Sequence, residues 1–314
     1  MNTPRTGFTT YLKIGRVSNL PTVWTNVLAG AFLSGHAADV PTLLWVMLAI
    51  TLFYTGGMYL NDAFDADIDA RERPNRPIPS GQISAKAVSA IGCAMLMGGI
   101  FIVAPYGVLA VQAGSALSLA ILLYNAWHKG NVFSPVIMGS CRALVYALAA
   151  WVCLPQSPDA LLWGMLAVFA HIAGLTYAAK QESLDRIDRL WPLFILVLPF
   201  AIFVLNFELT PLALMALLLL AVADILAVRL LALRRQGGDV PRAVAQLIAA
   251  CALLDAAAVA FSGGSWPWVL ACVLAYLASR LFQKLIPKTE INIDDFDDFG
   301  MLDKFKQYCI GKVE

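Results

Sequence analysis

Long apolar runs, separated by short polar or Gly/Pro-containing stretches, occupy most of the chain. Ten of these runs reach or approach the ~20 residues that a helix needs to cross a bilayer. They lie at residues 17–36, 41–62, 85–104, 107–127, 132–153, 160–180, 190–206, 210–233, 241–262 and 266–286. The pattern predicts an all-α, polytopic membrane helical bundle of nine to ten transmembrane helices. The lower number applies if the seventh run, which contains Pro192 and Pro199, does not cross.

The basic residues divide the connecting loops into two classes. The loops after the odd-numbered runs, HAADV, PYG, LPQSPDA, NFELT and SGGSW, contain neither Lys nor Arg. The other side carries Arg71, Arg73, Arg76, Lys86, Lys129, Arg186, Arg189, Arg234, Arg235, Arg242 and Lys288. This segregation follows the positive-inside rule and favours an even number of spans. We therefore expect a multi-pass protein of the bacterial inner membrane with both termini in the cytoplasm.

Composition agrees with this class of protein. Of the 314 residues, 60% are hydrophobic and 14% are charged, against ~45–50% and ~25% in an ordinary soluble domain. A nucleic-acid-binding protein, a Rossmann enzyme and a secreted disulfide scaffold are excluded, and the six scattered cysteines lack metal-ligand spacing. Residues 1–288 are predicted to form one membrane domain. Residues 289–314, acidic and then mixed in charge, are predicted to form a cytoplasmic tail or an interfacial helix.

The strongest chemical pattern is NDAFDADID, at the cytoplasmic end of the second run. On a helix, Asp62, Asp65 and Asp69 share one face with Asn61 beside them, whereas Asp67 points elsewhere. Carboxylates crowded in this way repel one another and resist leaving water. Mg²⁺ prefers oxygen ligands and is often shared between carboxylates and substrate phosphates. The pattern therefore indicates a magnesium site, with a solvated acidic loop as the alternative.

Three arginines follow in the loop at residues 63–84, which also contains three prolines. Cations beside a metal-binding carboxylate face suit a polyanion that bridges the two, and a diphosphate is the natural one. Arg73 and Arg76 are predicted to bind it, ahead of Arg71. Anchoring of the loop at the cytoplasmic membrane surface is the alternative explanation for some of these charges.

These residues resemble a known family. NDAFDADID fits the NDxxDxxxD motif, and RPNRPIPSG resembles the following segment, of the UbiA superfamily of intramembrane prenyltransferases. The resemblance implies a bundle around a central cavity with an Asp-rich cap on the cytoplasmic side. It also implies Mg²⁺-dependent transfer of a prenyl chain from an isoprenoid diphosphate to a small acceptor within membrane lipid, without nucleic acid or a protein partner. By resemblance, the residues that bind Mg²⁺–diphosphate are Asn61, Asp62, Asp65 and Asp69, the three aspartates being catalytic.

The second motif of the family departs from its usual form in this chain. The family usually ends its sixth span with a DxxxD-type pair, and here the stretch at 177–188 reads YAAKQESLDRID. Glu182 and Asp185 have the i, i+3 spacing that would let them share a metal ion, and Asp185 is expected to act in catalysis. Gln181 has the four-residue spacing to Asp185 but is an amide, so a second full metal site is in doubt. Lys180 is expected to contact phosphate, and KQESLDR resembles the EboC-like subgroup of the superfamily.

Two basic residues lie at or inside predicted spans. Lys129 ends the fourth run and by resemblance contacts phosphate, or else anchors the helix at the membrane surface. Arg142 lies about ten residues into the fifth run, where an arginine costs roughly 2.5–3.5 kcal/mol on insertion scales. It is therefore expected to face a substrate cavity or to pair with an intramembrane carboxylate, Asp224 or Asp255.

The first and sixth runs contain further polar residues. By resemblance, Asn19 and Asn26 contact the acceptor. His171, in the middle of the sixth run, is interpreted as a hydrogen-bonded core residue rather than a base.

Two other functions fit the sequence. Ten spans with intramembrane charges suit a secondary transporter or flippase of an anionic substrate. Against it, we find no inverted repeat, and the densest polar cluster lies at the cytoplasmic face rather than at the midplane. The third hypothesis is a non-catalytic membrane protein that binds prenyl diphosphate. Neither the acceptor nor the prenyl length is indicated by the sequence.

Overall fold

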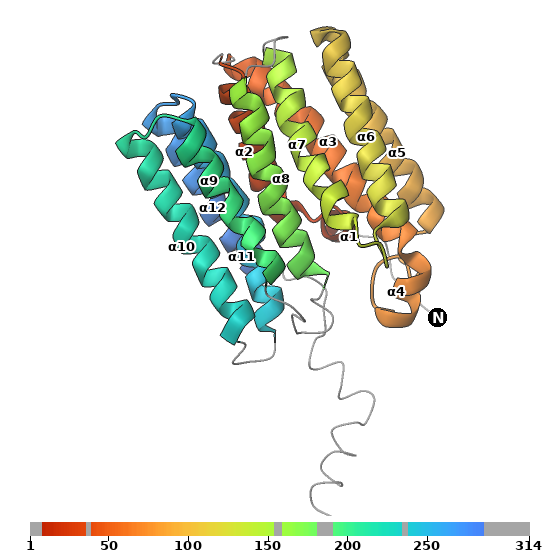
Figure 1. The fold of residues 1–314 in the computed structure, drawn as a ribbon. Coiled ribbons are helices and arrows are strands. Elements are labelled where there is room, and N and C mark those ends of the chain that lie inside the picture. The colour runs from red at the N-terminus through yellow and green to blue at the C-terminus, as the bar shows by residue number, and fades with distance from the viewer. Residues whose placement is uncertain (1–7, 36–38, 154–158, 181–190, 234–237, 286–314) are drawn as a thin grey trace, which may run out of the picture.

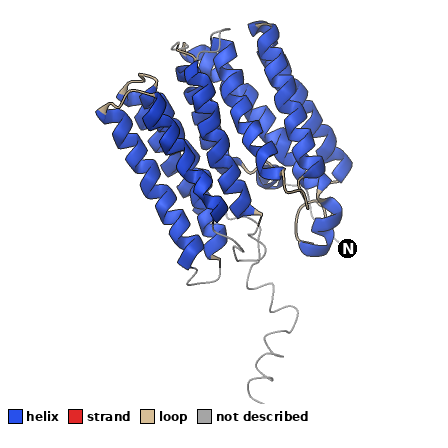
Figure 2. Ribbon diagram, viewed as in Figure 1, coloured by secondary structure: helices blue, strands red, loops and turns tan. Residues whose placement is uncertain are grey.

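The computed structural model describes residues 8–35, 39–153, 159–180, 191–233 and 238–285. Helices are the only regular elements in these ranges (Figure 2). In the first half of the chain they are α1 (Phe8–Ile14), η1 (Val17–Asn19), α2 (Leu20–Leu33), α3 (Val40–Phe64), α4 (Ala66–Glu72), α5 (Ala85–Val103), η2 (Ala104–Tyr106) and α6 (Val108–Trp127). In the second half they are α7 (Ser134–Cys153), α8 (Asp159–Ala179), η4 (Trp191–Val197), α9 (Leu198–Asn206), α10 (Pro211–Leu233), α11 (Asp239–Phe261) and α12 (Trp266–Leu285).

The long helices lie side by side in one bundle (Figure 1). Eight of the described helices are long and apolar enough to cross a membrane, namely α3, α5 with η2, α6, α7, α8, α10, α11 and α12. The predicted all-α membrane bundle is therefore confirmed. The first and seventh predicted runs also fold as helices but are shorter, α2 with 14 residues and the segment Pro192–Asn206. In the latter, Pro199 stands at the start of α9, where the 3₁₀-helix η4 gives way to an α-helix, because proline has no N–H for the preceding turn.

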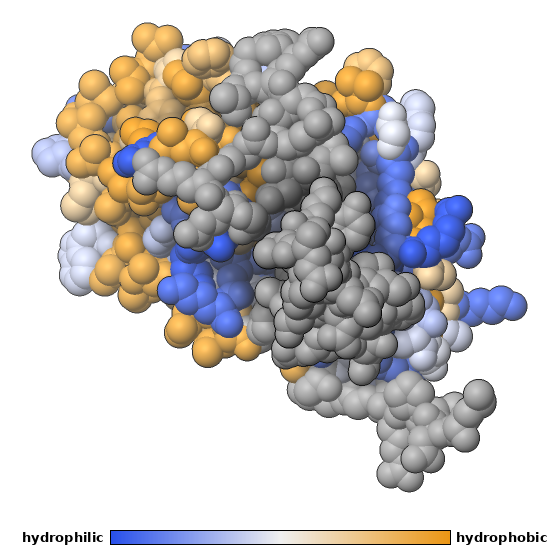
Figure 3. Space-filling model, turned by 90° about the horizontal axis from the view of Figure 1, so that it is seen from below, coloured by the Kyte–Doolittle hydropathy of each residue, from blue (hydrophilic) through white to orange (hydrophobic). Residues whose placement is uncertain are grey.

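The connections alternate between the two ends of the bundle. The described basic residues other than Arg142 belong to the end that carries α4, and the described parts of the loops at the opposite end contain neither Lys nor Arg. Figure 3, seen from the α4 end, shows hydrophilic side chains gathered there beside hydrophobic residues. The charge asymmetry of the sequence thus corresponds to two chemically different ends of the folded protein.

The centre of the bundle is filled with side chains. In α11, 89% of the most apolar 18-residue window is buried, and this helix packs against α2, α8, α10 and α12. The cavity described below therefore lies to one side of the centre, between α2, α3, α6 and α7.

Two glycines fix the position of α3 against α5. A Cβ atom at Gly56 would lie 2.9 Å from the carbonyl oxygen of Gly92, and one at Gly92 would lie 2.8 Å from Cγ of Leu60. No side chain fits in these gaps, so the two backbones approach closely. This contact holds the end of α3 that carries the aspartate motif.

The alternation of the loops predicts the side on which each loop is accessible. Lys86 and Glu208 are both exposed and lie at opposite ends of the bundle. In intact cells a membrane-impermeant maleimide should label Glu208→Cys above the background of the parent chain, whereas Lys86→Cys should need permeabilised cells. Labelling of Lys86→Cys from outside would reverse the proposed orientation.

Candidate active site

The aspartate motif lies at a break between two helices rather than on one continuous helix. α3 ends at Phe64 and α4 begins at Ala66, with Asp65 between them at φ −85° and ψ −2°. The helix expected over the whole motif is therefore interrupted. The amide of Asp69 nevertheless donates to the carbonyl oxygen of Asp65 over 2.8 Å, so the helical register of the side chains persists across the break.

The four predicted ligands all lie on the buried face of this junction. Asn61, Asp62, Asp65 and Asp69 are each at most 8% exposed. Asp67, which the spacing places on another face, is exposed to solvent. The division into one buried face and one outward carboxylate agrees with the sequence pattern.

Arg76 bridges two of the aspartates. Its Nη1 atom lies 2.7 Å from Oδ2 of Asp69 and 3.7 Å from Oδ1 of Asp62. The loop that follows α4 carries Arg76 back to the motif, and the side chain of Arg76 is itself largely buried. The repulsion expected among the carboxylates is thus balanced in part by a cation from the same loop.

Arg16, which precedes the motif in the sequence, also contacts it. Its Nη2 atom donates to Oδ1 of Asn61 over 3.2 Å and lies 3.4 Å from Oδ1 of Asp62. Arg16 is the one described non-glycine residue with a positive φ, at φ 45° and ψ 44°. The Tyr54 hydroxyl donates to its carbonyl oxygen over 3.3 Å. A left-handed conformation costs on the order of 1–3 kcal/mol outside glycine and is concentrated at functional sites.

Two side chains from the turn after α6 lie beside Asp65. Nζ of Lys129 lies 3.2 Å from Oδ1, and Nε2 of His128 lies 3.6 Å from Oδ2. Burial alone would raise the pKa of Asp65, but the neighbouring His128 and Lys129 hold it below its ordinary value. The carboxylate is therefore ionised at neutral pH, the form in which it can ligate a metal ion.

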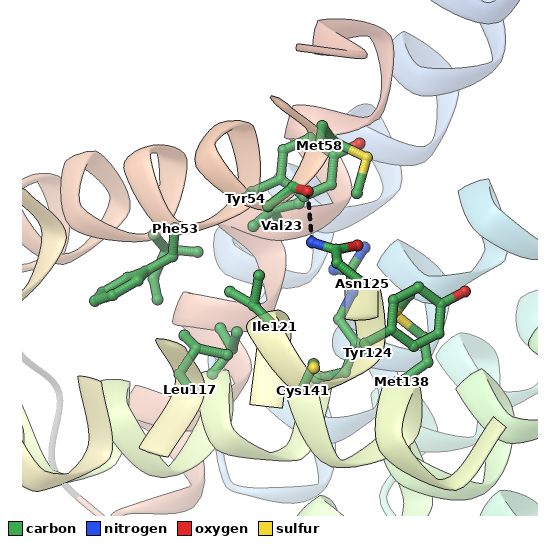
Figure 4. A pocket seen from close by; sticks show the side chains of 14 residues that line it. Val23, Phe53, Tyr54, Met58, Leu117, Ile121, Tyr124, Asn125, Met138 and Cys141 are labelled. Atoms are coloured by element: carbon green, nitrogen blue, oxygen red, sulfur yellow. Dashed lines mark hydrogen bonds between the residues drawn. The ribbon is translucent and has the colours of Figure 1, made fainter. Parts of the chain in front are cut away.

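An apolar cavity of about 100 Å³ lies between α2, α3, α6 and α7 (Figure 4). Its wall is made by Val23, Ile50, Phe53, Tyr54, Gly57, Met58, Leu117, Ile121, Tyr124, Asn125, Met138, Cys141, Arg142 and Val145. Asn125 joins the cavity to the aspartates, because its side chain accepts from Nδ2 of Asn61 over 3.2 Å and donates to the carbonyl oxygen of Gly57 over 3.0 Å. The aspartate motif is thus connected to the cavity wall through Asn61 and Asn125.

Arg142 both lines this cavity and belongs to a buried network. Its Nη1 atom donates to the carbonyl oxygen of Thr22 over 3.2 Å and to Oδ1 of Asn26. Asn26 in turn donates to both oxygens of Asp255, at 2.8 and 2.7 Å. Arg142 thus combines features of the two expected roles. It lines the cavity, and it is linked to the carboxylate of Asp255 through the side-chain amide of Asn26 rather than by a direct ion pair.

The remaining predicted residues lie elsewhere in the bundle, at the end of α4, or outside the described ranges. Asn26 is fully buried and does not line the cavity, and Asn19 accepts a hydrogen bond from Gln283 over 3.3 Å. Lys180 donates to the carbonyl oxygen of Asn131 over 2.5 Å. Arg73 is half-buried at the end of α4. Two predicted metal ligands, Glu182 and Asp185, lie outside the described residues.

His171 is a core residue, as the sequence suggests. It is completely buried, its Nε2 atom lies 3.2 Å from the carbonyl oxygen of Leu247, and its Nδ1 atom lies 3.7 Å from Oδ2 of Asp224. Asp224 thus pairs with His171 rather than with Arg142.

Several site residues carry only weak signals in the sequence. Arg16, Asn125 and His128 all contact the aspartate motif, yet the pattern alone assigns them no role. The spacing at the end of α6 does link Asn125 and His128 to other residues of the site. Asn125 stands four residues before Lys129, and Tyr124 stands four residues before His128, so that each pair shares one helix face. Tyr124 and His128 accordingly stack with ring centroids 5.0 Å apart.

The donor atoms of the motif suit a hard divalent cation. Three carboxylates and one amide supply oxygen ligands, the kind that Mg²⁺ prefers. Among the described residues, no three His, Cys, Asp or Glu side chains converge closely enough to enclose a metal by themselves. Mg²⁺ usually keeps several water ligands and is shared between carboxylates and substrate phosphates.

Comparison with known proteins shows one consistent likeness. A family model described as the UbiA prenyltransferase family matches residues 22–243. The chain is 30% identical to digeranylgeranylglyceryl phosphate synthase of Methanopyrus kandleri over 183 residues, covering 56% of this chain and 63% of that protein. It is 27% identical to protoheme IX farnesyltransferase of Leptospira interrogans over 180 residues, 54% of this chain and 62% of that protein. The matched stretches thus span less than two thirds of either relative.

Solved structures agree on the fold. A structure of digeranylgeranylglyceryl phosphate synthase superposes with a TM-score of 0.60 at 19% identity, covering 81% of this chain and 98% of that one. A UbiA homolog from Archaeoglobus fulgidus bound to DMAPP and Mg²⁺ superposes with a TM-score of 0.50 at 12% identity, covering 88% and 100%. At these identities the likeness establishes the arrangement of helices.

The buried ion pair between Arg76 and Asp69 predicts an asymmetry between two aspartates two residues apart. Asp69→Asn removes the nearer of the two carboxylates that balance the largely buried Arg76, and breaking a buried ion pair costs on the order of 3 kcal/mol. It should lower the melting temperature of the detergent-solubilised protein clearly. Asp67→Asn, at an exposed position, should change the free energy of unfolding by less than about 0.5 kcal/mol. Equal melting temperatures for the two variants would show that the pair does not stabilise the fold.

Proposed function

Because this chain belongs to the UbiA prenyltransferase family, we propose that it transfers a prenyl chain from an isoprenoid diphosphate to a small acceptor within the membrane and releases diphosphate. One observation carries the proposal. Four oxygen-donor side chains lie buried next to an apolar cavity, to which Asn61 is joined by its hydrogen bond with Asn125 of the cavity wall. The three aspartates among them are held by Arg16, Arg76, His128 and Lys129. A diphosphate joined to an apolar chain has the complementary shape and charge.

Different residues would bind the diphosphate and the prenyl chain of that substrate. Arg76 and Lys129 are positioned to turn from their carboxylates to phosphate oxygens, with Arg16, Arg73 and Lys180 as further cations at this end. Cations directed at the departing diphosphate stabilise the charge that develops there, the effect that usually contributes most to catalysis.

We assign Asn61, Asp62, Asp65 and Asp69 as ligands of Mg²⁺, together with Glu182 and Asp185 from the second motif. When bound, Mg²⁺ would act as a Lewis acid that neutralises charge on the leaving diphosphate. The apolar cavity wall excludes water, which would otherwise capture the allylic cation before the acceptor reaches it.

The acceptor is not assigned. The two named relatives act, by their names, on different molecules, one forming a glyceryl phosphate lipid and the other farnesylating protoheme IX. Arg142 lines the cavity and is proposed to contact the acceptor, with Asn19 as a further contact. Asn26 does not line the cavity and instead accepts a hydrogen bond from Arg142. We place the protein in a bacterial inner membrane with both termini in the cytoplasm, on the segregation of basic residues.

Transfer and transport can be separated in one experiment. Purified protein in liposomes, given radiolabelled geranyl diphosphate, Mg²⁺ and lipid extract from cells that lack the protein, should release diphosphate and yield a labelled lipid of higher mass. Chelation of Mg²⁺ should abolish both. Uptake of intact geranyl diphosphate into the vesicles, with no diphosphate released and no new lipid, would instead identify a transporter or flippase.

The first motif predicts a graded set of activities. Asp62→Asn, Asp65→Asn or Asp69→Asn should lower the rate of diphosphate release about a hundred- to a thousandfold, the usual cost of removing one oriented electrostatic stabiliser. Asp67→Asn provides the matched control, since Asp67 is exposed and off the buried face. If Asp67→Asn is as damaging as Asp65→Asn, the single-face metal site is wrong.

The second motif is tested by the metal requirement. If Glu182 and Asp185 complete the metal site, alanine at either position should raise the Mg²⁺ concentration needed for half-maximal rate. If the first motif suffices, both changes should be mild and Lys180→Ala the more harmful. Parent-like rates in all three variants would remove this stretch from the site.

A further inference from the structure

The cavity has an open end and a closed end. The residues near the aspartate motif, Met58, Tyr124 and Met138, are partly exposed. At the other end the wall consists of four apolar side chains that are at most 5% exposed, Ile50, Phe53, Leu117 and Val145. Figure 4 shows Phe53 and Leu117 at one end of the cavity and Tyr124, Asn125 and Met138 at the other. We call the four buried residues the closed end.

Phe53 is the largest side chain of the closed end, and two glycines stand behind it. A Cβ atom at Gly99 of α5 would lie 2.8 Å from the Phe53 ring, and one at Gly114 of α6 would lie 3.3 Å from its Cζ atom. The ring therefore fills the space between α3, α5 and α6 that the glycines leave. Without the ring, the cavity would extend along these two glycines.

The distance from the aspartate motif to Phe53 limits the length of the prenyl chain that fits in the cavity. Nine residues of α3 separate Asp62 from Phe53, a rise of about 13 Å at ~1.5 Å per residue. Three extended backbone bonds span about 3.6 Å, so the four main-chain bonds of one isoprene unit span about 5 Å. Two units take about 10 Å of this rise and a third would exceed it, with the diphosphate and its metal ion held beyond Asp62, towards Asp65 and Asp69.

We propose that Phe53 limits the donor of this protein to a short prenyl chain, with a ten-carbon diphosphate as the best fit. The proposal rests on the function proposed above, because it takes the cavity as the site of the prenyl tail. The wall of the closed end favours this occupant, since its four side chains carry no polar atom. A third or fourth isoprene unit would meet the Phe53 ring.

Binding can be measured without knowing the acceptor. The purified full-length chain is titrated with radiolabelled diphosphates of five, ten, fifteen and twenty carbons, with Mg²⁺ or with a chelator. The parent protein should bind the ten-carbon compound at least tenfold more tightly than the twenty-carbon one, and only with Mg²⁺. Phe53→Leu should move the optimum to fifteen carbons, because it opens the space beside Gly99 and Gly114. Phe53→Trp should shorten the cavity and move the optimum to five carbons. This second variant tests the proposal even if Phe53→Leu impairs folding.

Phe101→Leu is the matched control, since Phe101 of α5 is 75% exposed on the outer surface of the bundle and should leave the profile unchanged. The proposal is overturned if the parent binds the twenty-carbon diphosphate as tightly as the ten-carbon one, or if folded Phe53 variants keep the parent profile. Absence of Mg²⁺-dependent binding at every chain length would overturn the donor site itself, and the length limit with it. The two failures are thus distinguishable.

Discussion

A carboxylate placed against the apolar interior of a membrane protein must have its charge balanced, because removing an unpaired ion from water costs several kcal/mol. Asp62, Asp65 and Asp69 meet this condition through partners from three separate stretches of chain. Arg16 precedes the first span, Arg76 follows α4, and Lys129 follows α6. The charge balance therefore joins three segments at one end of the bundle.

The same condition applies deeper in the bundle, where no water compensates a polar group. Asp255 accepts hydrogen bonds from Thr25, Asn26 and Tyr146, so that α2, α7 and α11 converge on one carboxylate. His171 and Asp224 form a second contact between α8 and α10. Intramembrane ionisable residues often mark a substrate pathway, but here most of their polar atoms face neighbouring helices. Arg142 is the exception, because it also lines the cavity.

The sequence predicts those features of the molecule that depend on local spacing. Apolar runs locate the helices, and the i, i+3, i+7 spacing separates the buried aspartates from the exposed Asp67. Features that depend on distant contacts are not readable in this way. Arg16, which has a left-handed backbone, contacts Asp62 across a sequence separation of 46. The break at Asp65, the hydrogen bonds that bury Asn26 and the off-centre cavity likewise follow from how helices pack rather than from their own composition.

The pairing of the aspartates with protein cations has a thermodynamic consequence. An arginine or lysine displaced from its carboxylate by an entering metal ion needs a new anion, and a phosphate group arriving in the same event supplies one. Metal alone would have to compete with Arg76 and Lys129 for the carboxylates, and diphosphate alone would have to compete with the carboxylates for the cations. Each ligand removes the competitor of the other, so their binding free energies are coupled and, by linkage, each raises the affinity for the other by the same factor. In the proposed function, these ion pairs thus favour binding of metal and diphosphate together over binding of either one alone.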